Sequence, residues 1–296
     1  MTVLVVGDLV TDVLVAHAGP LAVGSDTDAR ISVGGGGQAA NTAAWLARAG
    51  AGVILIAAVG DDHAGRERIA ELVAAGVHCA VRAHAGVATG SVVVLSSADE
   101  RTMITDRGAA LLLDPADVRA AVRNAPGVTH LHLSGYPLLH TGSRPGGLAA
   151  LAAAREWGLS TSVDAASAEP LRQLGARAFL DLIHGTDLLL CNADEAAVLA
   201  GAGTPEEQAA VLTADAGNVV VKRGGDGAVW AARDGVLRSV AGVRVPMIDP
   251  TGAGDAFAAG LLTAWCAGAD PAAALAAGAA LGAAAVQTIG ARPRTA

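Results

Sequence analysis

A regular alternation of apolar runs with helix-length segments constrains the fold of this chain more than any other feature. From residue 114 onward, short Val-, Leu- and Ile-rich runs predict strands, and the segments between them carry helix-start signals. The predicted strands are 128–134, 160–164, 188–191 and 219–222, and helices are predicted at 115–124, 147–157 and 170–183. Such repeated units predict a doubly wound, mostly parallel α/β sheet with helices on both faces and a ligand at the strands' carboxyl ends.

Composition agrees with this fold class. Hydrophobic residues make up 52% of the 296 residues, but aromatic residues only 2%, so the core must consist of Ala, Val and Leu. Such a core favours α/β layers over an aromatic-rich β-sandwich. No linker or internal repeat interrupts the chain, so we predict a single domain over residues 1–296.

The first third of the chain departs from the alternation. The runs 77–83, 91–97 and 101–105 are short, β-rich and separated by turns, which is typical of hairpins. Together with the strand-like runs near 10–18 and 30–33, they predict a small β-sheet formed from about 10–33 and 77–105. We expect this sheet to act as a lid over the ligand site.

Charge and cysteine content limit the partners. The net charge is −8 and no Lys/Arg run occurs, which argues against nucleic acid or an acidic membrane as partner. The three cysteines lie far apart without CxxC spacing, which fits a reducing cytoplasm. The uncharged stretch 271–291 is dominated by Ala and Gly and is interpreted as a buried helix. We therefore predict a cytoplasmic protein with a small-molecule substrate.

The most informative motif is the stretch Asp249–Phe257, DPTGAGDAF. Gly252 and Gly254 let a bound group approach the backbone, and the apolar helix that follows would direct free amides at that group. Such a helix start attracts phosphate, so a carboxylate there suggests a base beside a phosphoryl group. Asp255 is the candidate; the alternative is that it only favours the helix dipole beside a tight turn.

A second glycine-rich stretch, Gly34–Gly37, precedes a helix predicted over 38–49. With Asp61 further on, it could be interpreted as a dinucleotide-binding fingerprint. That fingerprint follows the first strand of a βαβ unit, whereas two strand-like segments come first here. The only lysine, Lys222, stands in Val-Lys-Arg-Gly, so a Walker-type phosphate loop is excluded.

Together these motifs resemble the ribokinase-like (PfkB) family of ATP-dependent carbohydrate and nucleoside kinases, almost from end to end. The stretch DPTGAGDAF is similar to the family's C-terminal signature, and GGQAAN at 36–41 to its N-terminal GGxxxN signature. Asn192–Glu195 matches the NxxE motif, and Gly224–Gly227 matches the GxxG of the nucleotide loop. The four matches occur in the family's order.

The resemblance implies a catalytic centre. Asp255 would be the base that deprotonates a substrate hydroxyl, and Gly252, Ala253 and Gly254 would form the anion hole. ATP and Mg²⁺ would be the cofactors, with K⁺ or another monovalent cation beside the anion hole near Asp249. A homodimer built through the lid is also implied.

The resemblance further assigns binding roles. The residues implied to bind the nucleotide are Asn192, Lys222, Gly224 and Gly227; those implied to bind metal are Glu195, through water, and Asp249. The sugar hydroxyls would be held by Asp12, Gly36, Gly37 and Asn41.

The chain departs from the family's pattern at several positions. Val10 and Gln38 stand where ribokinases usually carry Asn and Lys, which argues against D-ribose as substrate. Pro250 replaces the commoner Thr. The segment Asp99–Met103 resembles the lid edge of several sugar kinases, where Arg101 could either meet the substrate or be an exposed hairpin arginine.

The leading hypothesis is transfer of the ATP γ-phosphoryl group to a primary hydroxyl of a sugar. The alternative within the fold is a nucleoside kinase of the pseudouridine or adenosine type. Two further hypotheses come from other protein classes. An NAD-dependent enzyme would explain neither Asp255 nor the NxxE motif. A non-catalytic sugar-binding protein is the other, and the intact Asp255 argues against it.

Overall fold

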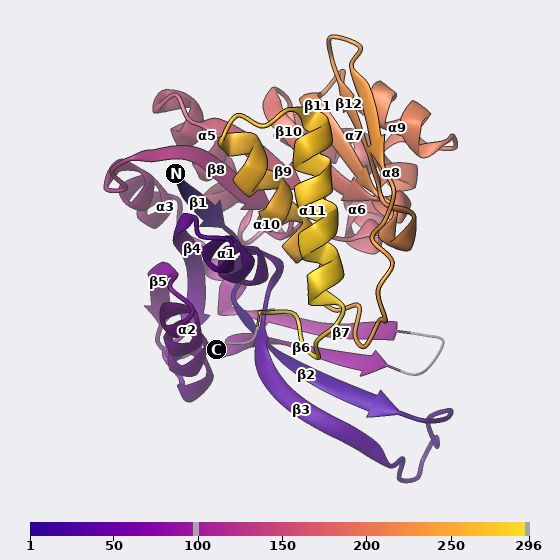
Figure 1. Ribbon diagram of the computed structural model, residues 1–296. Coiled ribbons are helices and arrows are strands. Elements are labelled where there is room, and N and C mark those ends of the chain that lie inside the picture. Colours follow the sequence, from indigo (N-terminus) through magenta and orange to yellow (C-terminus); the bar gives the residue numbers. More distant parts are fainter. Residues whose placement is uncertain (97–100, 294–296) are drawn as a thin grey trace.

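One large sheet forms the centre of the molecule (Figure 1). The computed structural model describes residues 1–96 and 101–293, with the side chain of Arg101 excepted. The strand order is β13-β12-β11-β10-β9-β8-β1-β4-β5; the strands from β11 to β5 run parallel, and β12 and β13 are antiparallel at one edge. The strands are β1 (Thr2–Val6), β4 (Gly52–Gly60), β5 (His78–His84), β8 (Val128–Ser134), β9 (Ser160–Asp164), β10 (Thr186–Asn192), β11 (Ala216–Lys222), β12 (Ala228–Ala232) and β13 (Leu237–Val240). The predicted parallel α/β sheet is confirmed.

Helices cover both faces of this sheet and create two separate apolar cores. Alternate residues of β1 contribute to each: Val3 and Val5 pack in one core, and Leu4 and Val6 in the other. The helices α1 (Gln38–Arg48), α2 (His63–Ala74), α10 (Ala253–Cys266) and α11 (Pro271–Ala285) cover the first face. The second is covered by α3 (Pro115–Arg123), α5 (Arg144–Glu156), α6 (Ala168–Leu174), α7 (Ala176–Ile183), α8 (Ala193–Ala200) and α9 (Pro205–Leu212).

Local signals account for the helix starts. A capping box starts α9 at Thr204: the Thr204 hydroxyl accepts from the backbone amide of Glu207, and the Glu207 carboxylate accepts from the backbone amide of Thr204. Asp270 caps α11 in front of Pro271. The single helix predicted over 170–183 was wrong in one respect, because Gly175, at φ 92°, separates α6 from α7.

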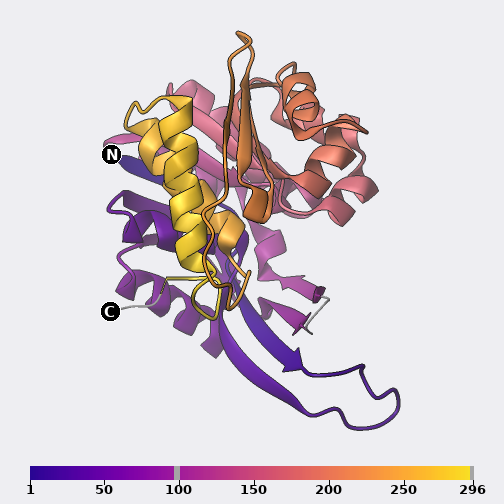
Figure 2. The same cartoon turned by 45° about the vertical axis from the view of Figure 1, so that its right-hand side comes forward.

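A second, four-stranded sheet projects from the body (Figure 2). Its order is β3-β2-β6-β7, and we call it the lid sheet; the strands are β2 (Val10–His17), β3 (Ala29–Gly36), β6 (Thr89–Ser96) and β7 (Arg101–Gly108). A small apolar cluster of Val10, Val92, Val94 and Ala110 joins it to the body. The predicted edge Asp99–Met103 lies partly outside the described residues, as does the side chain of Arg101.

The prediction that the run 77–83 belongs to the lid was wrong. β5 pairs in parallel with β4 at the edge of the main sheet, and α2 forms the crossover between them. Val77 is buried in the main core, and Cys79 and Val81 pack against it. The apolar side of this strand thus stabilises the body, and its polar side, with Arg82 and His84, made it resemble a hairpin strand.

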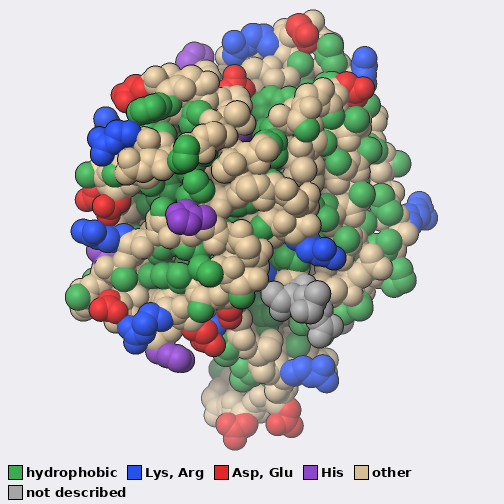
Figure 3. All heavy atoms as spheres, turned by 60° about the vertical axis from the view of Figure 1, so that its left-hand side comes forward, with side chains coloured by type: hydrophobic (Ala, Val, Ile, Leu, Met, Phe, Trp, Pro, Cys, Tyr) green, Lys and Arg blue, Asp and Glu red, His purple; other side chains and the backbone are tan. Residues whose placement is uncertain are grey.

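The surface carries no strong basic region on the face shown in Figure 3, among the described residues. Acidic side chains gather at the tip of the lid sheet, where the loop between β2 and β3 carries exposed Asp26 and Asp28.

The Ala-rich α11 packs against α10, with Phe257 touching Gly278. Within the described ranges, no helix combines the length and apolar character needed to cross a membrane.

Candidate active site

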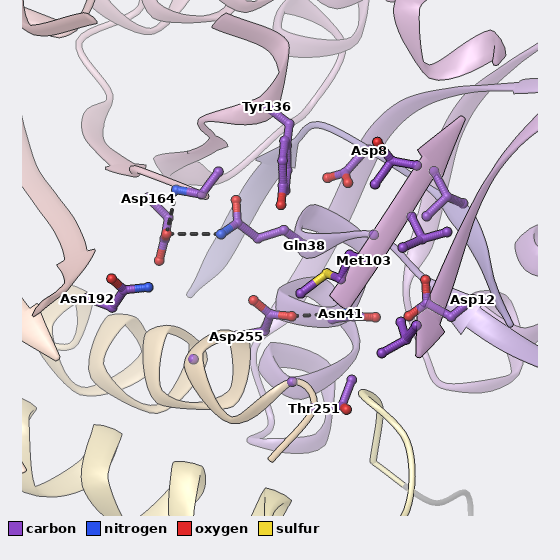
Figure 4. Close-up of a pocket in the computed structure, with 18 of the residues that line it drawn as sticks. Asp8, Asp12, Gln38, Asn41, Met103, Tyr136, Asp164, Asn192, Thr251 and Asp255 are labelled. Carbon is purple, nitrogen blue, oxygen red and sulfur yellow. Dashed lines mark hydrogen bonds between the residues drawn. The ribbon is translucent and has the colours of Figure 1, made fainter. Parts of the chain in front are cut away.

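The carboxyl ends of five neighbouring strands place polar residues in a row above the sheet. Asp8 follows β1, Tyr136 follows β8, Asp164 ends β9, Asn192 ends β10 and Lys222 ends β11. They line an open cavity of about 270 Å³, which α1, α10 and the lid sheet border on the other sides (Figure 4). The site therefore lies where parallel α/β sheets bind ligands. The other residues around the cavity are Val10, Asp12, Gly37, Gln38, Asn41, Val92, Val94, Met103, Thr105, Arg107, Ala166, Glu195, Pro250, Thr251, Gly252, Gly254 and Asp255.

The turn before α10 has the geometry that the sequence predicted. Gly252 is its N-cap, at φ 77° in the left-handed region, and a Cβ there would lie 2.3 Å from the carbonyl oxygen of Ala291. Only glycine fits this position. Helix α10 begins at Ala253, so its first amides lie beside the cavity that Gly252 and Gly254 line.

Asp255 lies in the first turn of α10, at the floor of the cavity, and points toward Asn41 of α1 (Figure 4). Asn41 Nδ2 donates to Asp255 Oδ2 over 2.9 Å. Burial raises the pKa of Asp255 to about 8; the bond from Asn41 opposes that shift, the carboxylate of Asp164 adds to it and the ammonium of Lys222 opposes it. A carboxyl group with a raised pKa in a cleft is suited to proton transfer near neutral pH.

Asp249, for which a metal-binding role is predicted, braces the turn before α10. Its Oδ1 accepts from the amide and hydroxyl of Thr251, at 2.9 and 2.5 Å, and its Oδ2 accepts from the Gly290 amide at 2.9 Å. The structure thus ties this carboxylate to the turn and to the chain after α11.

The N-terminal glycine motif is shaped around two aspartates. A Cβ on Gly36 would lie 2.0 Å from Asp12 Oδ1, and one on Gly37, at φ 97°, would lie 2.5 Å from the Asp8 carbonyl oxygen. Asp12, Gly37 and Asn41, for which substrate-binding roles are predicted, line the cavity. Gly36 contributes by leaving space for the Asp12 carboxylate.

Replacing Gly36 with alanine is expected to move the Asp12 carboxylate out of the cavity wall. We expect the KM for the acceptor substrate to rise by about tenfold and unfolding free energy to fall by about 1–3 kcal/mol, as for overpacked sites. Steady-state kinetics and urea unfolding measure the two effects. Gly34→Ala is the matched control, since a Cβ at Gly34 in the same strand meets nothing within 4 Å. An unchanged KM in Gly36→Ala would remove Asp12 from the substrate site.

Lys222 forms a buried ion pair with Asp164, a residue that sequence reasoning did not select. Lys222 Nζ lies 2.6 Å from Asp164 Oδ2, while Gln38 Nε2 donates to Asp164 Oδ1 at 2.9 Å. Burial favours a lower pKa for Lys222, but Asp164 and Glu195 raise it above its ordinary value, so the ammonium stays charged. The position of Asp164 at the end of a predicted strand was the available signal.

The NxxE motif forms the N-terminal cap of α8. Glu195 Oε2 accepts from the Asn192 amide at 2.8 Å, and Asn192 Oδ1 accepts from the Glu195 amide at 2.9 Å. Asn192 Nδ2 also donates to Glu195 Oε1 at 2.7 Å. Burial, and next the charge of Asp164, raise the pKa of Glu195 to about 7. Both side chains line the cavity.

These residues fit a hydrated magnesium–phosphate group better than a bare metal site. Within residues 1–96 and 101–293, no three His, Cys, Asp or Glu side chains converge on a common metal position. Mg²⁺ usually keeps several waters and binds through one or two carboxylates together with substrate phosphates. Glu195 and the ammonium of Lys222, at the same wall of the cavity, match that chemistry.

The two glycines predicted for nucleotide binding lie beyond Lys222. Gly224 begins a 3₁₀ turn, Gly224–Asp226, and Gly227 follows it at φ 93°. A Cβ on Gly227 would lie 1.9 Å from the Val240 carbonyl oxygen, so this glycine is needed for the connection between β11 and β12. Neither belongs to the cavity wall among the described residues.

Arg107 of the lid sheet was also missed by sequence reasoning. Its guanidinium lies 3.8 Å from the ring centre of Tyr136, and its Nη1 lies 3.4 Å from Asp8 Oδ2. Beside it, Val10, Val92 and Val94 give this part of the wall an apolar surface. The lid sheet therefore presents the guanidinium of Arg107 and an aliphatic patch of Val10, Val92 and Val94 to the cavity.

Comparison with known proteins agrees with this geometry. Residues 2–295 match the pfkB family of carbohydrate kinases. The chain is 33% identical over 237 residues to the ATP-dependent ribose-1-phosphate kinase of Halopiger xanaduensis, covering 78% of this chain and 73% of that protein. It is 30% identical over 274 residues to a fructokinase of Escherichia coli, covering 88% and 82%.

A solved structure shares the whole fold. The crystal structure of a putative ribokinase II from E. coli, in complex with ATP and Mg²⁺, superposes with a TM-score of 0.86 at 25% identity, covering 98% of this chain and 94% of that one. The full-length family match, the identities and the common fold lead to one conclusion: the chain belongs to the pfkB family of carbohydrate kinases and is a phosphotransferase.

Proposed function

We propose that the protein transfers the γ-phosphoryl group of ATP to a primary hydroxyl of a sugar, with Asp255 as the base. The observation that carries this proposal is the position of Asp255: its carboxylate lies at the cavity floor, in the first turn of α10, with a raised pKa. An acceptor hydroxyl placed there would meet a base and the amides of a helix start together.

The reaction follows from this placement. Asp255 accepts the proton of the acceptor hydroxyl while the oxygen of that hydroxyl attacks the γ-phosphorus atom; the bond from this phosphorus to the bridging oxygen of ATP breaks, and ADP leaves. The amides at Gly252, Ala253 and Gly254 lie where negative charge builds up on the transferring group, and the helix dipole favours that charge. Lys222, held by Asp164, adds a fixed positive charge. Bound ATP would supply the phosphoryl group, and Mg²⁺, held through water by Glu195, would neutralise charge on the phosphates.

The two substrates would occupy opposite sides of the cavity. Asn192 ends β10, Lys222 ends β11 and Glu195 lies in the first turn of α8. These three residues would hold phosphate and hydrated Mg²⁺. Asp12 and Asn41, on the opposite side, would hold the sugar hydroxyls. Gly224 and Gly227, which lie beyond Lys222, remain candidates for contacts with parts of the nucleotide other than its phosphates. The turn that Asp249 braces remains the candidate site beside which K⁺ would bind.

The lid sheet would exclude water during transfer, because ATP hydrolysis is the competing reaction. Its residues Val10, Val92 and Val94 already form part of the cavity wall. Exposed Ile31 and Val33 on β3, with Ile104 on β7, offer apolar surface for the homodimer that the sequence predicts.

The aliphatic patch favours a second candidate function. A nucleoside could place its base against Val92, Val94 and Met103, since aliphatic side chains can enclose a base. Tyr136 is less available for stacking, because Arg107 covers one face of its ring. The named relatives act on a sugar phosphate or, by name, on fructose, which supports the sugar first.

A coupled ADP-release assay with MgATP and K⁺ tests the proposal. The acceptors are ribose, ribose 1-phosphate, fructose, other hexoses, 2-keto-3-deoxy sugars, adenosine and pseudouridine. We expect ADP release that depends on a sugar and stops when Mg²⁺ is chelated. Release with nucleosides alone would replace the first candidate by the second, and silence with intact ATP binding would favour the non-catalytic sugar-binding protein.

A further inference from the structure

Arg292 reaches the substrate side of the cavity from the chain segment after α11. Its guanidinium donates three hydrogen bonds. Nε donates to Asn41 Oδ1 at 3.2 Å, and Nη2 donates to the Gly36 carbonyl oxygen at 2.9 Å. Nη1 donates to Glu71 Oε2 at 3.2 Å. The side chain is only 13% exposed. Arg292 therefore contacts both Gly36 and Asn41 of the N-terminal motif at 36–41, and it can influence how the side chains of that motif are oriented.

The neighbouring residues hold Arg292 in place. The Trp45 indole donates to the Ala291 carbonyl oxygen at 2.9 Å, and the Gly290 amide is bound to Asp249. Gly252 packs directly against Ala291, which ties the same segment to the turn before α10. The segment 290–292 therefore joins the turn of Asp255 to the N-terminal glycine motif.

The bond from Arg292 determines which way the Asn41 amide faces. A side-chain amide has one end that accepts and one that donates. With its oxygen bound to Arg292 Nε, Asn41 can present only Nδ2 to Asp255, and that is the bond observed. Without Arg292, the amide could rotate and turn its oxygen toward Asp255. The hydrogen bonds from Arg292 to Asn41 and from Asn41 to Asp255 thus keep Asn41 Nδ2, the donor, directed at the base.

We propose that Arg292 is a positioning residue for phosphoryl transfer, which acts through Asn41 to keep a hydrogen-bond donor directed at Asp255. This inference rests on the proposed function, since it takes Asp255 as the base and Asn41 as part of the acceptor site. It assigns a function to a C-terminal arginine outside the four signature motifs.

The charges around both groups favour this arrangement. Asp255 faces Asp164, Lys222 and Asp8, besides the Asn41 amide. Arg292 faces Glu71, Asp12, Arg68 and Cys79; burial lowers its pKa to about 10, while Glu71 and Asp12 oppose that shift. Arg292 therefore keeps its positive charge at neutral pH and continues to donate to Asn41.

A double-mutant cycle tests the coupling. We expect Arg292→Met to lower kcat about tenfold in the wild-type background, but by less than about twofold when Asn41 is already alanine, because coupled residues are not additive. Arg292→Lys, which keeps the charge but not the fork of donors, should fall between wild type and Arg292→Met. Arg66→Met is the matched control, since Arg66 on α2 pairs with Asp61 at the surface.

The pH profile gives a second readout that a purely structural role would not change. Once the Asn41 oxygen can turn toward Asp255, it accepts from the protonated carboxyl and stabilises the neutral form. The acid limb of log(kcat/KM) should then move to higher pH in Arg292→Met and stay in place in Arg66→Met. Thermal unfolding of each variant confirms that the fold is retained.

Two results would overturn the inference: equal losses from Arg292→Met in both backgrounds, or an unshifted acid limb. Failure of the proposed function gives a different result, namely an Asp255→Asn enzyme that still turns over. An inactive Asp255→Asn combined with an additive cycle would refute the role of Arg292 alone.

Discussion

Replacement of Asp255 by asparagine is expected to lower kcat by at least about 10³-fold, within the range for loss of a general base. ATP should still bind, because Asn192, Glu195 and Lys222 lie on other elements of the cavity. Kinetics with the acceptor found in the substrate panel, and a nucleotide-binding titration, measure the two effects. Near-normal turnover in this variant would refute the assigned base.

The same substitution is expected to stabilise the fold at neutral pH. The pKa of Asp255 is raised from 3.8 to about 8 by folding, so ionisation of this group opposes folding at every pH above the unfolded value. Asparagine removes that cost, and the Tm at pH 7 should rise while activity is lost. Asp117→Asn is the matched control, a carboxylate in the first turn of α3 that lies outside the cavity.

Replacement of Lys222 by methionine is expected to damage both stability and catalysis. Asp164 would be left buried without its cation, which typically costs about 3–5 kcal/mol of unfolding free energy. Loss of the fixed charge beside the phosphoryl group should lower kcat by about 10²–10³-fold. Urea unfolding and steady-state kinetics measure the two losses.

A second variant separates the two effects of Lys222. Lys222→Met combined with Asp164→Asn removes the unpaired charge, so it should recover much of the stability and none of the activity. Recovery of activity in the double variant would show that Lys222 serves only to neutralise Asp164. The exposed pair of Arg172 and Glu169 on α6 offers a control, and Arg172→Met should change stability by less than about 1 kcal/mol.

The sequence predicted the fold well where its signals were local. The strands 128–134 and 160–164 show short apolar runs, and helix α3 combines hydrophobic periodicity with an Asp114 cap, all within a dozen residues. The assignment of β5 to the lid failed because the sequence of a strand does not determine which strand it pairs with. The alternating pattern of β5 fits an edge of the main sheet as well as an edge of the lid sheet. The break at Gly175 was missed for a related reason, since the helical pattern continues on both sides of it.

The candidate site was predictable to the extent that its residues lie in short motifs. Asp255, Asn41 and Glu195 were each found in a signature, and each lines the cavity. Arg292 was not, because its significance depends on Asn41, which lies 251 residues away in the chain. Asp164 became apparent only when β9 was seen between β8 and β10, beside Lys222.

The contact of Gly252 with Ala291 bears on how the enzyme is made. The base and its turn are completed by residues at the far end of the described chain, through Gly290, Ala291 and Arg292. During synthesis on the ribosome, the glycine motif at 34–37 and the strands of the main sheet emerge before this segment does. A growing chain could therefore fold most of its body without acquiring an ordered catalytic centre. Phosphoryl transfer would begin only after residues 290–292 have left the ribosome and docked, so chains that lack this segment would not consume ATP.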